Sequence, residues 1–206
     1  AEPVDRSKTP EAPCQQLVSN GVPFPGHQIA IVDEDGGPLP ERQVGQIIAR
    51  GPSVSPGYHD NPEANGESFR PDGWLYTGDL GYLADGNLYV CGRQKDLIII
   101  RGANFHAQDL EWSVSDVKGV RRGNVVAFGS QVAQEERLVV AVECHSQDVD
   151  QVRTEVEARI SKDFGLTAHE VVAVPMGTLP KTSSGKAQRN RTRTLYEQGE
   201  LDMHHH

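Results

Sequence analysis

The sequence predicts an α+β protein in two parts, a β-rich unit followed by a smaller domain in which helices pack on a sheet. Two observations support this prediction. Short apolar segments divided by turn residues fill residues 26–92, without the pattern of a long helix. After residue 96, apolar strands alternate with stretches whose apolar residues recur every three or four positions, which is the spacing of an amphipathic helix.

The first part begins with a polar stretch. Residues 1–25 carry five prolines and little periodicity, so we expect a loop, with a short strand near Gln16–Val18. Residues 57–69 have turn chemistry throughout. The expected strands are 27–33, 44–51, 73–83 and 87–93, and a tight Asp-Gly turn joins the last two.

The second part alternates strands and helices. Val149, Val152, Val156, Ile160 and Phe164 recur at steps of three and four, which predicts an amphipathic helix over 148–164. Continuous apolar runs predict strands that lie inside a sheet. The expected strands are 96–102, 124–130, 137–144 and 170–175, and the other expected helices are 107–117 and 186–198, the last ended by Gly199.

The charge balance excludes some classes of partner. The chain has 206 residues with 20 basic and 29 acidic side chains, a net charge of −9. Nucleic acids and anionic membranes attract cationic surfaces, so we expect neither as a partner. The longest apolar run, 97–100, is far too short to span a bilayer, and we expect a soluble protein.

The cysteines and histidines indicate neither a disulfide framework nor a metal site. Three widely spaced cysteines, an odd number, indicate a reducing, cytoplasmic compartment. Residues 203–206 are interpreted as the remnant of a purification tag, and the other five histidines lack metal-ligand spacing. The chain also starts without Met, so we expect a fragment whose first residues are an artificial boundary or a loop.

Lys186 lies in the stretch LPKTSSGKAQR (179–189) of an otherwise acidic chain. A phosphate-binding P-loop would need a glycine where Pro180 stands and Ser or Thr where Ala187 stands, so that interpretation fails. A lysine on a flexible, hydroxyl-rich loop can deliver a point charge to a phosphate or carboxylate. Taken alone, a solvated linker lysine explains the residue better.

Two further segments carry candidate binding residues. Asp79, in WLYTGDLG (74–81), is suited to accept hydrogen bonds from vicinal ribose hydroxyls, or it stabilises its own turn. In GRQKDLIIIRG (92–102), glycines flank a charged junction and an apolar strand, and the chain after Gly102 can approach a ligand closely. The alternative there is a hairpin with solvated charges.

These segments, together with GQIIARGPSVSPGYHDNPE (45–63), resemble the carboxy-terminal portion of the AMP-forming adenylating superfamily, which contains acyl- and aryl-CoA ligases, luciferases and peptide-synthetase adenylation domains. The resemblance runs from about residue 20 to residue 200. RGANFHAQDLE (101–111) is most similar to fatty-acyl-AMP ligases, although His106-Ala107 replaces an aromatic-proline pair and Ala103 replaces a common arginine. The resemblance implies that 26–94 end the large amino-terminal domain and that 95–200 form a mobile lid domain.

The resemblance also implies roles for individual residues. Asp79 would bind the ribose of ATP and of the acyl-adenylate, and Arg93 would contact the ribose or the phosphate. Lys95 would be the hinge, and Lys186 would bridge the attacking carboxylate and the α-phosphate. Gly102, Ala103 and Asn104 would line the path of a pantetheine thiol in the second half-reaction.

The implied function is ATP-dependent activation of a fatty acid and transfer of the acyl group to an acyl carrier protein of a polyketide synthase. Mg²⁺, the phosphate loop and the acyl pocket would belong to the upstream domain, so we expect this chain alone to be inactive. Arg189, Arg191 and Arg193 form a candidate cationic face for an acidic carrier helix, or a solvated helix face. Two alternatives are an acyl- or aryl-CoA ligase and a non-catalytic module that binds a carrier or another partner.

Overall fold

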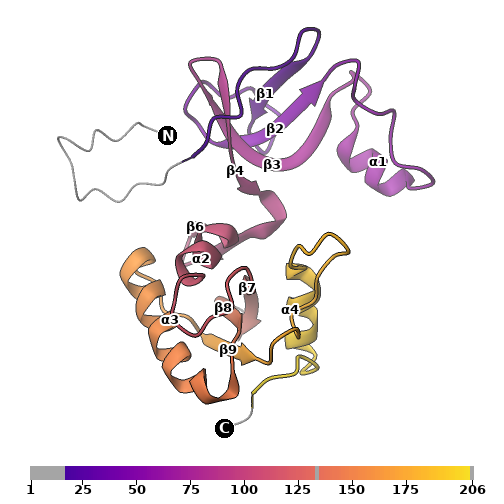
Figure 1. The fold of residues 1–206 in the computed structure, drawn as a ribbon. Helices are drawn as coiled ribbons and strands as arrows, with labels where there is room; N and C mark the ends of the chain where they lie inside the picture. Colours follow the sequence, from indigo (N-terminus) through magenta and orange to yellow (C-terminus); the bar gives the residue numbers. More distant parts are fainter. Residues whose placement is uncertain (1–16, 133–134, 205–206) are drawn as a thin grey trace, which may run out of the picture. The chain divides into compact units, whose positions relative to one another are not determined.

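The computed structural model describes residues 17–132 and 135–204. The chain divides into two compact units, residues 1–95 and residues 96–206, and each is described by itself (Figure 1). The α+β fold class predicted from the sequence is confirmed. Residues 1–16 of the expected initial loop and 205–206 of the expected tag remnant lie outside the described residues.

The amino-terminal unit contains one antiparallel sheet of four strands. Each strand pairs with the next one along the chain. Ile31, Val32, Ile47 and Ile48 of this sheet are buried. The strands are β1 (Gln28–Val32), β2 (Gly45–Arg50), β3 (Leu75–Ala84) and β4 (Asn87–Arg93). Before them, Ser19 makes a single bridge to Tyr89 in place of the short strand expected near residues 16–18.

The Asp-Gly turn between β3 and β4 has the predicted two-residue form. Ala84 pairs with Asn87, so Asp85 and Gly86 alone form the loop. Their φ values are +50° and +73°, the conformation in which a two-residue turn follows the twist of its strands. The Glu41 carboxylate accepts hydrogen bonds from both backbone N–H groups at 3.0 Å and stabilises the turn.

The expectation of turns throughout residues 57–69 is wrong for part of this segment, which contains α1 (Pro62–Ser68). The Asn61 side chain accepts a hydrogen bond from the backbone N–H of Ala64, and Pro62 occupies the first turn. Asn at the N-cap and Pro in the first turn both favour a helix start. These start signals are short, and the helix buries no residue completely.

The carboxy-terminal unit is built around a three-stranded sheet. β7 (Val125–Val132) is antiparallel to β8 (Glu135–Glu143), and β8 is parallel to β9 (Glu170–Val174). The parallel pair is connected through η2 (Ser146–Asp148) and α3 (Val149–Phe164), as parallel strands require a crossover. α3 has the predicted apolar face and ends at Gly165, whose φ of +65° is typical of a helix C-terminus.

Both faces of this sheet are covered. α2 (Ala107–Val114) and α3 lie on one side of the sheet, and α4 (Arg189–Glu197) lies on the other (Figure 1). Successive strand residues point to opposite faces, so Val125 and Ala127 join one buried cluster while Val126 and Phe128 join the second. This two-sided burial explains the continuous apolar runs in the sequence.

The segment after the unit boundary differs from the prediction. A 3-10 turn, η1 (Gln94–Asp96), leads into a hairpin of β5 (Leu97–Ile100) and β6 (Ala103–His106). β6 was not predicted, and β5 is only half buried because Ile99 is 49% exposed between buried Ile98 and Ile100. The helix expected over 186–198 begins only at Arg189.

Candidate active-site residues

Asp79 lies in β3, where its position is set by two hydrogen bonds of Thr77. The Thr77 hydroxyl donates to the Ile47 carbonyl at 2.9 Å and accepts from the Asp79 N–H at 3.1 Å. Asp79 is directly paired with Arg93 across the β3–β4 ladder, and Arg93 Nε lies 3.1 Å from Asp79 Oδ1. The carboxylate therefore contacts the neighbouring strand, in contrast to the alternative in which it stabilises its own turn.

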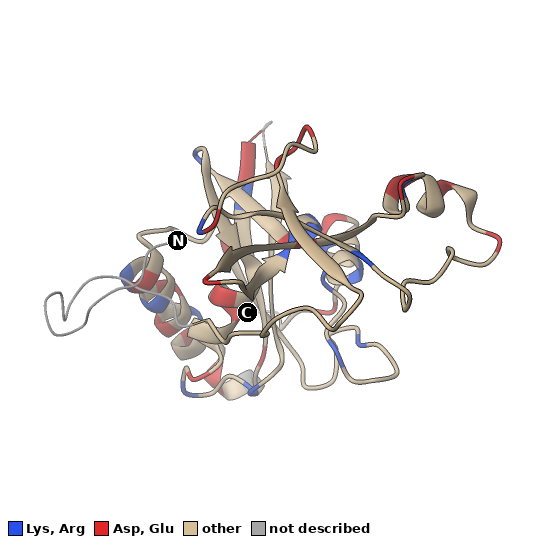
Figure 2. Cartoon of the chain, turned by 90° about the horizontal axis from the view of Figure 1, so that it is seen from above, with Lys and Arg blue, Asp and Glu red and all other residues tan. Residues whose placement is uncertain are grey.

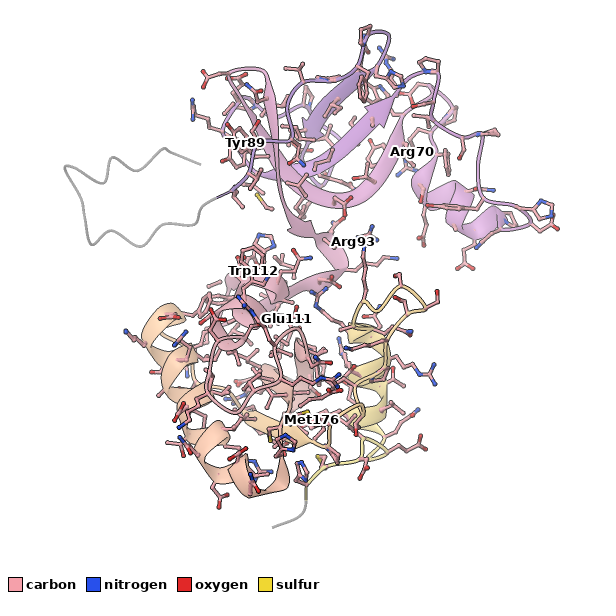
Figure 3. The ribbon with its side chains drawn as sticks, viewed as in Figure 1. Arg70, Tyr89, Arg93, Glu111, Trp112 and Met176 are labelled. Carbon is pink, nitrogen blue, oxygen red and sulfur yellow. The ribbon has the colours of Figure 1, made fainter. Side chains whose placement is uncertain are left out.

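The Asp79–Arg93 pair remains open to a ligand. The side chains are 31% and 65% exposed, and Arg93 is at the end of β4 (Figure 3). An ionised carboxylate offers several lone pairs, so Asp79 can accept from vicinal hydroxyls while Arg93 holds one oxygen. The guanidinium retains donors suited to a phosphate oxygen. The chemistry of this pair fits the ribose and phosphate of a nucleotide.

Lys95 and residues 102–104 occupy exposed positions. Lys95 lies in η1 and is the last residue of the amino-terminal unit. In the other unit, Arg101 and Gly102 form the two-residue turn of the β5–β6 hairpin, with φ values of +52° and +78°. Ala103 and Asn104 follow on the exposed start of β6. This hairpin is the one given above as the alternative interpretation. The role of residues 102–104 in a second half-reaction stays a prediction.

Lys186 lies on a hydrogen-bonded hairpin and not on an open loop. Lys181 and Ala187 form an antiparallel bridge, and the Thr182 N–H donates to the Lys186 carbonyl at 2.8 Å. The Thr182 hydroxyl accepts from the Lys186 N–H at 3.1 Å and lies 2.9 Å from the Ser184 hydroxyl. The hydroxyl-rich sequence thus closes a turn, and Lys186 is exposed on it. We call residues 179–188 the lysine hairpin.

The candidate cationic face of three arginines is not formed as expected. Arg189 makes ion pairs with Glu111 and Asp96 and is 20% exposed. Arg193 pairs with Glu197 one helical turn away, with Nε 2.8 Å from the carboxylate. Of these three arginines, Arg191 is exposed without an observed ion pair among the described residues. A guanidinium already held by two carboxylates cannot serve an acidic partner.

Three carboxylates next to the lysine hairpin were not identified from the sequence: Asp96, Glu111 and Glu143. Glu111, on α2 (Figure 3), accepts two hydrogen bonds from Arg189. Glu143 is fully buried, and its carboxylate accepts from the backbone N–H of Leu179 at 3.1 Å. The available signal for Glu143 was an acidic residue at the end of the wholly apolar run LVVAV (138–142).

Within residues 17–132 and 135–204, no group of three His, Cys, Asp or Glu side chains is placed to hold a metal ion. No helix in the same ranges has the length and apolarity needed to cross a bilayer. Figure 2 shows basic and acidic residues interspersed along the ribbon, so the net negative charge is not gathered in one segment.

Family models match both parts of the chain. Residues 5–59 match the AMP-binding enzyme model, and residues 95–206 match the AMP domain of Disco-interacting protein 2-like proteins. Together with the fold and the residues above, these matches define the class of the chain, the superfamily of AMP-binding enzymes. The chain belongs to this AMP-binding superfamily, and its carboxy-terminal unit belongs to the Disco-interacting protein 2-like family of AMP domains.

Curated relatives include several acyl ligases. A putative acyl-CoA synthetase of Caulobacter vibrioides is 40% identical over 87% of this chain and 32% of its own length. The medium-chain-fatty-acid–[acyl-carrier-protein] ligase JamA of Moorena producens is 34% identical over 91% of this chain and 34% of its own length. The chain therefore spans about a third of the length of the curated relatives that it matches.

Solved structures give the same assignment. The structure of the McyG A-PCP protein complexed with phenylalanyl-adenylate matches with a TM-score of 0.82 and 36% identity, over 89% of this chain and 34% of that one. A structure from a study of fatty acyl-adenylate ligases of E. coli and L. pneumophila matches with a TM-score of 0.78 and 39% identity, over 89% of this chain and 33% of that one. Both are similar to this chain across its two units.

Proposed function

We propose that this chain is the carboxy-terminal part of an ATP-dependent fatty-acyl-AMP ligase that passes its acyl group to an acyl carrier protein. The observation that carries the proposal is Lys186, an exposed ammonium on a short hydrogen-bonded hairpin in a chain of net charge −9. The similarity to JamA and to the fatty acyl-adenylate ligases supports the fatty acid and the carrier.

In the first half-reaction, a fatty-acid carboxylate oxygen forms a bond to the α-phosphorus of ATP, and the bond to the departing pyrophosphate breaks. Two anions meet, and negative charge spreads over the phosphate oxygens. The Lys186 ammonium reduces this repulsion and stabilises the transition state more than the ground state. Asp79 and Arg93 bind the ribose and the phosphate. Mg²⁺ would be held by the amino-terminal region of the whole protein.

In the second half-reaction, a thiol attacks the acyl carbon, a thioester forms and AMP leaves. Lys186 has no role in this step, and we propose that it leaves the reacting centre. The proposed hinge at Lys95, the residue at which the two units join, supplies the axis. The exposed residues 102–104 then line the path of the pantetheine arm. A hairpin with a small residue at its tip allows a thiol to pass closely.

The first experiment tests Lys186 in the longer protein that contains this chain. Lys186→Met should lower the rate of fatty-acid-dependent ATP–pyrophosphate exchange by about 10²–10³-fold, because it removes one preorganised electrostatic group. Thioester formation from supplied acyl-adenylate should be unchanged. Lys181→Met is the matched control, because Lys181 is exposed on the same hairpin. Full exchange activity in Lys186→Met would reject the proposed role.

The second candidate function, an acyl-CoA ligase, is favoured by the similarity to the putative acyl-CoA synthetase of Caulobacter vibrioides. The chemistry of adenylation is shared, and only the acceptor differs. Incubating the longer protein with palmitate and ATP, and with either coenzyme A or a phosphopantetheinylated carrier protein, separates the two. Thioester formation on the carrier and not on coenzyme A is the expected result, and the reverse would establish the alternative.

A further inference from the structure

Both ends of the lysine hairpin are fixed to carboxylates of the sheet and of α2. At its start, the Leu179 N–H donates to Glu143 Oε1 at 3.1 Å. Glu143 is fully buried, and Arg121 Nη1 donates to its other oxygen at 2.8 Å. A buried carboxylate paired with a cation and hydrogen-bonded to backbone is a fixed acceptor. The start of the hairpin is therefore anchored to the end of β8.

The end of the hairpin is anchored by Arg189. Its Nε and Nη2 donate to the two oxygens of Glu111, both at 2.7 Å, and its Nη1 donates to Asp96. The three side chains are only 13–20% exposed. The hydrogen bond to Glu111, followed by the charges of Glu111 and Asp96, raises the pKa of Arg189 despite its burial. The guanidinium is thus charged, and three of its five N–H donors are used in these hydrogen bonds.

Arg189 connects the lysine hairpin with the start of the unit. Asp96 is the residue after Lys95, and Glu111 also accepts from the Ala127 N–H of β7 at 3.0 Å. Three residues along the chain place the α carbon of Lys186 within about 11 Å of that of Arg189. The Gln188 N–H donates to the Pro180 carbonyl at 2.9 Å and closes this short connection.

We propose that Arg189 is a positioning residue, which holds Lys186 at a fixed place relative to Asp96 next to the hinge. The inference rests on the function proposed above for Lys186. When the unit turns about Lys95, the Arg189–Asp96 ion pair moves the lysine hairpin with it as one body. A planar guanidinium can donate two hydrogen bonds to Glu111 and a third to Asp96. A lysine ammonium cannot reproduce this geometry.

The test uses the longer protein and compares Arg189→Met with Arg191→Met. Arg189→Met should lower kcat of pyrophosphate exchange by about 10²-fold, because a displacement of about 1 Å at a reacting centre has that effect. KM for ATP and thioester formation from supplied acyl-adenylate should stay within about twofold of wild type. The double variant Arg189→Met/Lys186→Met should be no slower than Lys186→Met, since both act through one group.

Two further variants, Asp96→Asn and Arg189→Lys, test the positioning role if Arg189→Met folds poorly. Asp96→Asn leaves both hydrogen bonds between Arg189 and Glu111 intact. It should still lower kcat of pyrophosphate exchange by about tenfold, without affecting thioester formation. Arg189→Lys should not restore the rate. Equal losses in both half-reactions, or a double variant whose losses multiply, would show general destabilisation and overturn the proposal. Unchanged kcat in Arg189→Met would overturn it as well.

A structural measurement on the 206-residue chain separates this inference from the proposed function. In Arg189→Met, hydrogen exchange of the Thr182 and Gln188 amides should be at least about tenfold faster, while β8 amides keep their protection. Arg191→Met should leave both unchanged. Unaltered exchange at Thr182 and Gln188 would overturn the anchoring. If the anchoring holds but the wild-type longer protein lacks pyrophosphate exchange, the proposed function fails and the catalytic role of Arg189 fails with it.

Discussion

At the scale of single residues, Glu143 shows how a charge is kept inside the sheet. Its side chain has no solvent exposure, whereas its partner Arg121 is 48% exposed. The Arg121 backbone N–H also donates to the Glu143 carbonyl at 2.8 Å, so the two residues are held by both main chain and side chain. The pair is asymmetric, because Arg121 can be hydrated without Glu143 but Glu143 has no access to water.

This asymmetry predicts unequal effects of removing each partner. Arg121→Met should lower the free energy of unfolding by about 3 kcal/mol, since it leaves an uncompensated buried carboxylate. Glu143→Gln should cost less, because the amide oxygen still accepts from Leu179. The double variant should be more stable than Arg121→Met alone. Urea unfolding of the chain at pH 7 measures all three differences.

Arg122→Met provides the control for this series. Arg122 lies 3.5 Å from Asp116, and both side chains are well exposed, at 84% and 68%. An exposed ion pair of this kind contributes little, and the change in stability should stay within about 0.5 kcal/mol. Equal destabilisation by Arg121→Met and Arg122→Met would contradict the importance of burial.

At the scale of elements, the turns show which local structures the sequence predicts. The Asp85-Gly86 turn was predicted because two adjacent residues with positive φ have a distinct sequence preference. The β5–β6 hairpin was only the alternative interpretation of its segment, since Arg101 occupies the equivalent turn position with a φ of +52°, which its side chain does not favour. α1 was missed because seven residues give too few turns for an apolar period.

The turn at Asp85-Gly86 predicts a pH effect at Glu41. Hydrogen bonds from the Gly86 and Asp85 N–H groups lower the pKa of Glu41 from its ordinary value of 4.5. A carboxyl group with a lowered pKa stabilises the fold above its ordinary value, and this contribution is lost as the pH falls through the lowered pKa. The amide NMR shifts of Asp85 and Gly86 should therefore titrate with a midpoint below 4.5.

Glu41→Gln should abolish this titration and remove the associated pH dependence of the urea midpoint. Glu34→Gln is the matched control, because Glu34 is exposed in the turn after β1 and should leave the titration unchanged. A midpoint above 4.5, or a titration that persists in Glu41→Gln, would contradict the role of this carboxylate.

At the scale of the whole molecule, the core and the site differ in how far the sequence predicts them. The continuous apolar run from Val125 to Phe128 predicts a buried strand, and strand geometry then places successive residues in the two buried clusters, so this part of the core follows from local sequence. The Arg189–Glu111 and Arg189–Asp96 contacts join residues 78 and 93 positions apart. No local pattern records such a pairing, so Arg189 was wrongly expected to lie on a free cationic face.

Because the chain spans only about a third of its relatives' length, we expect it to be inactive by itself. It covers 32–34% of the relatives named above. Under the proposed function, the phosphate loop and the acyl pocket would lie in an upstream region of the longer protein. The 206-residue chain should therefore give no fatty-acid-dependent ATP–pyrophosphate exchange, while the longer protein does. Circular dichroism of the same sample serves as the control for folding. Exchange by the chain alone would contradict the prediction.

β7 is an outer strand of the sheet in the carboxy-terminal unit, and one of its hydrogen-bonding groups is occupied by a neighbour outside the sheet. The Ala127 N–H of β7 donates to Glu111 at 3.0 Å. Exposed strand margins are templates on which foreign polypeptides can add and start fibrils. Glu111 occupies one donor of this edge as well as holding Arg189, so we expect its loss to reduce solubility along with activity.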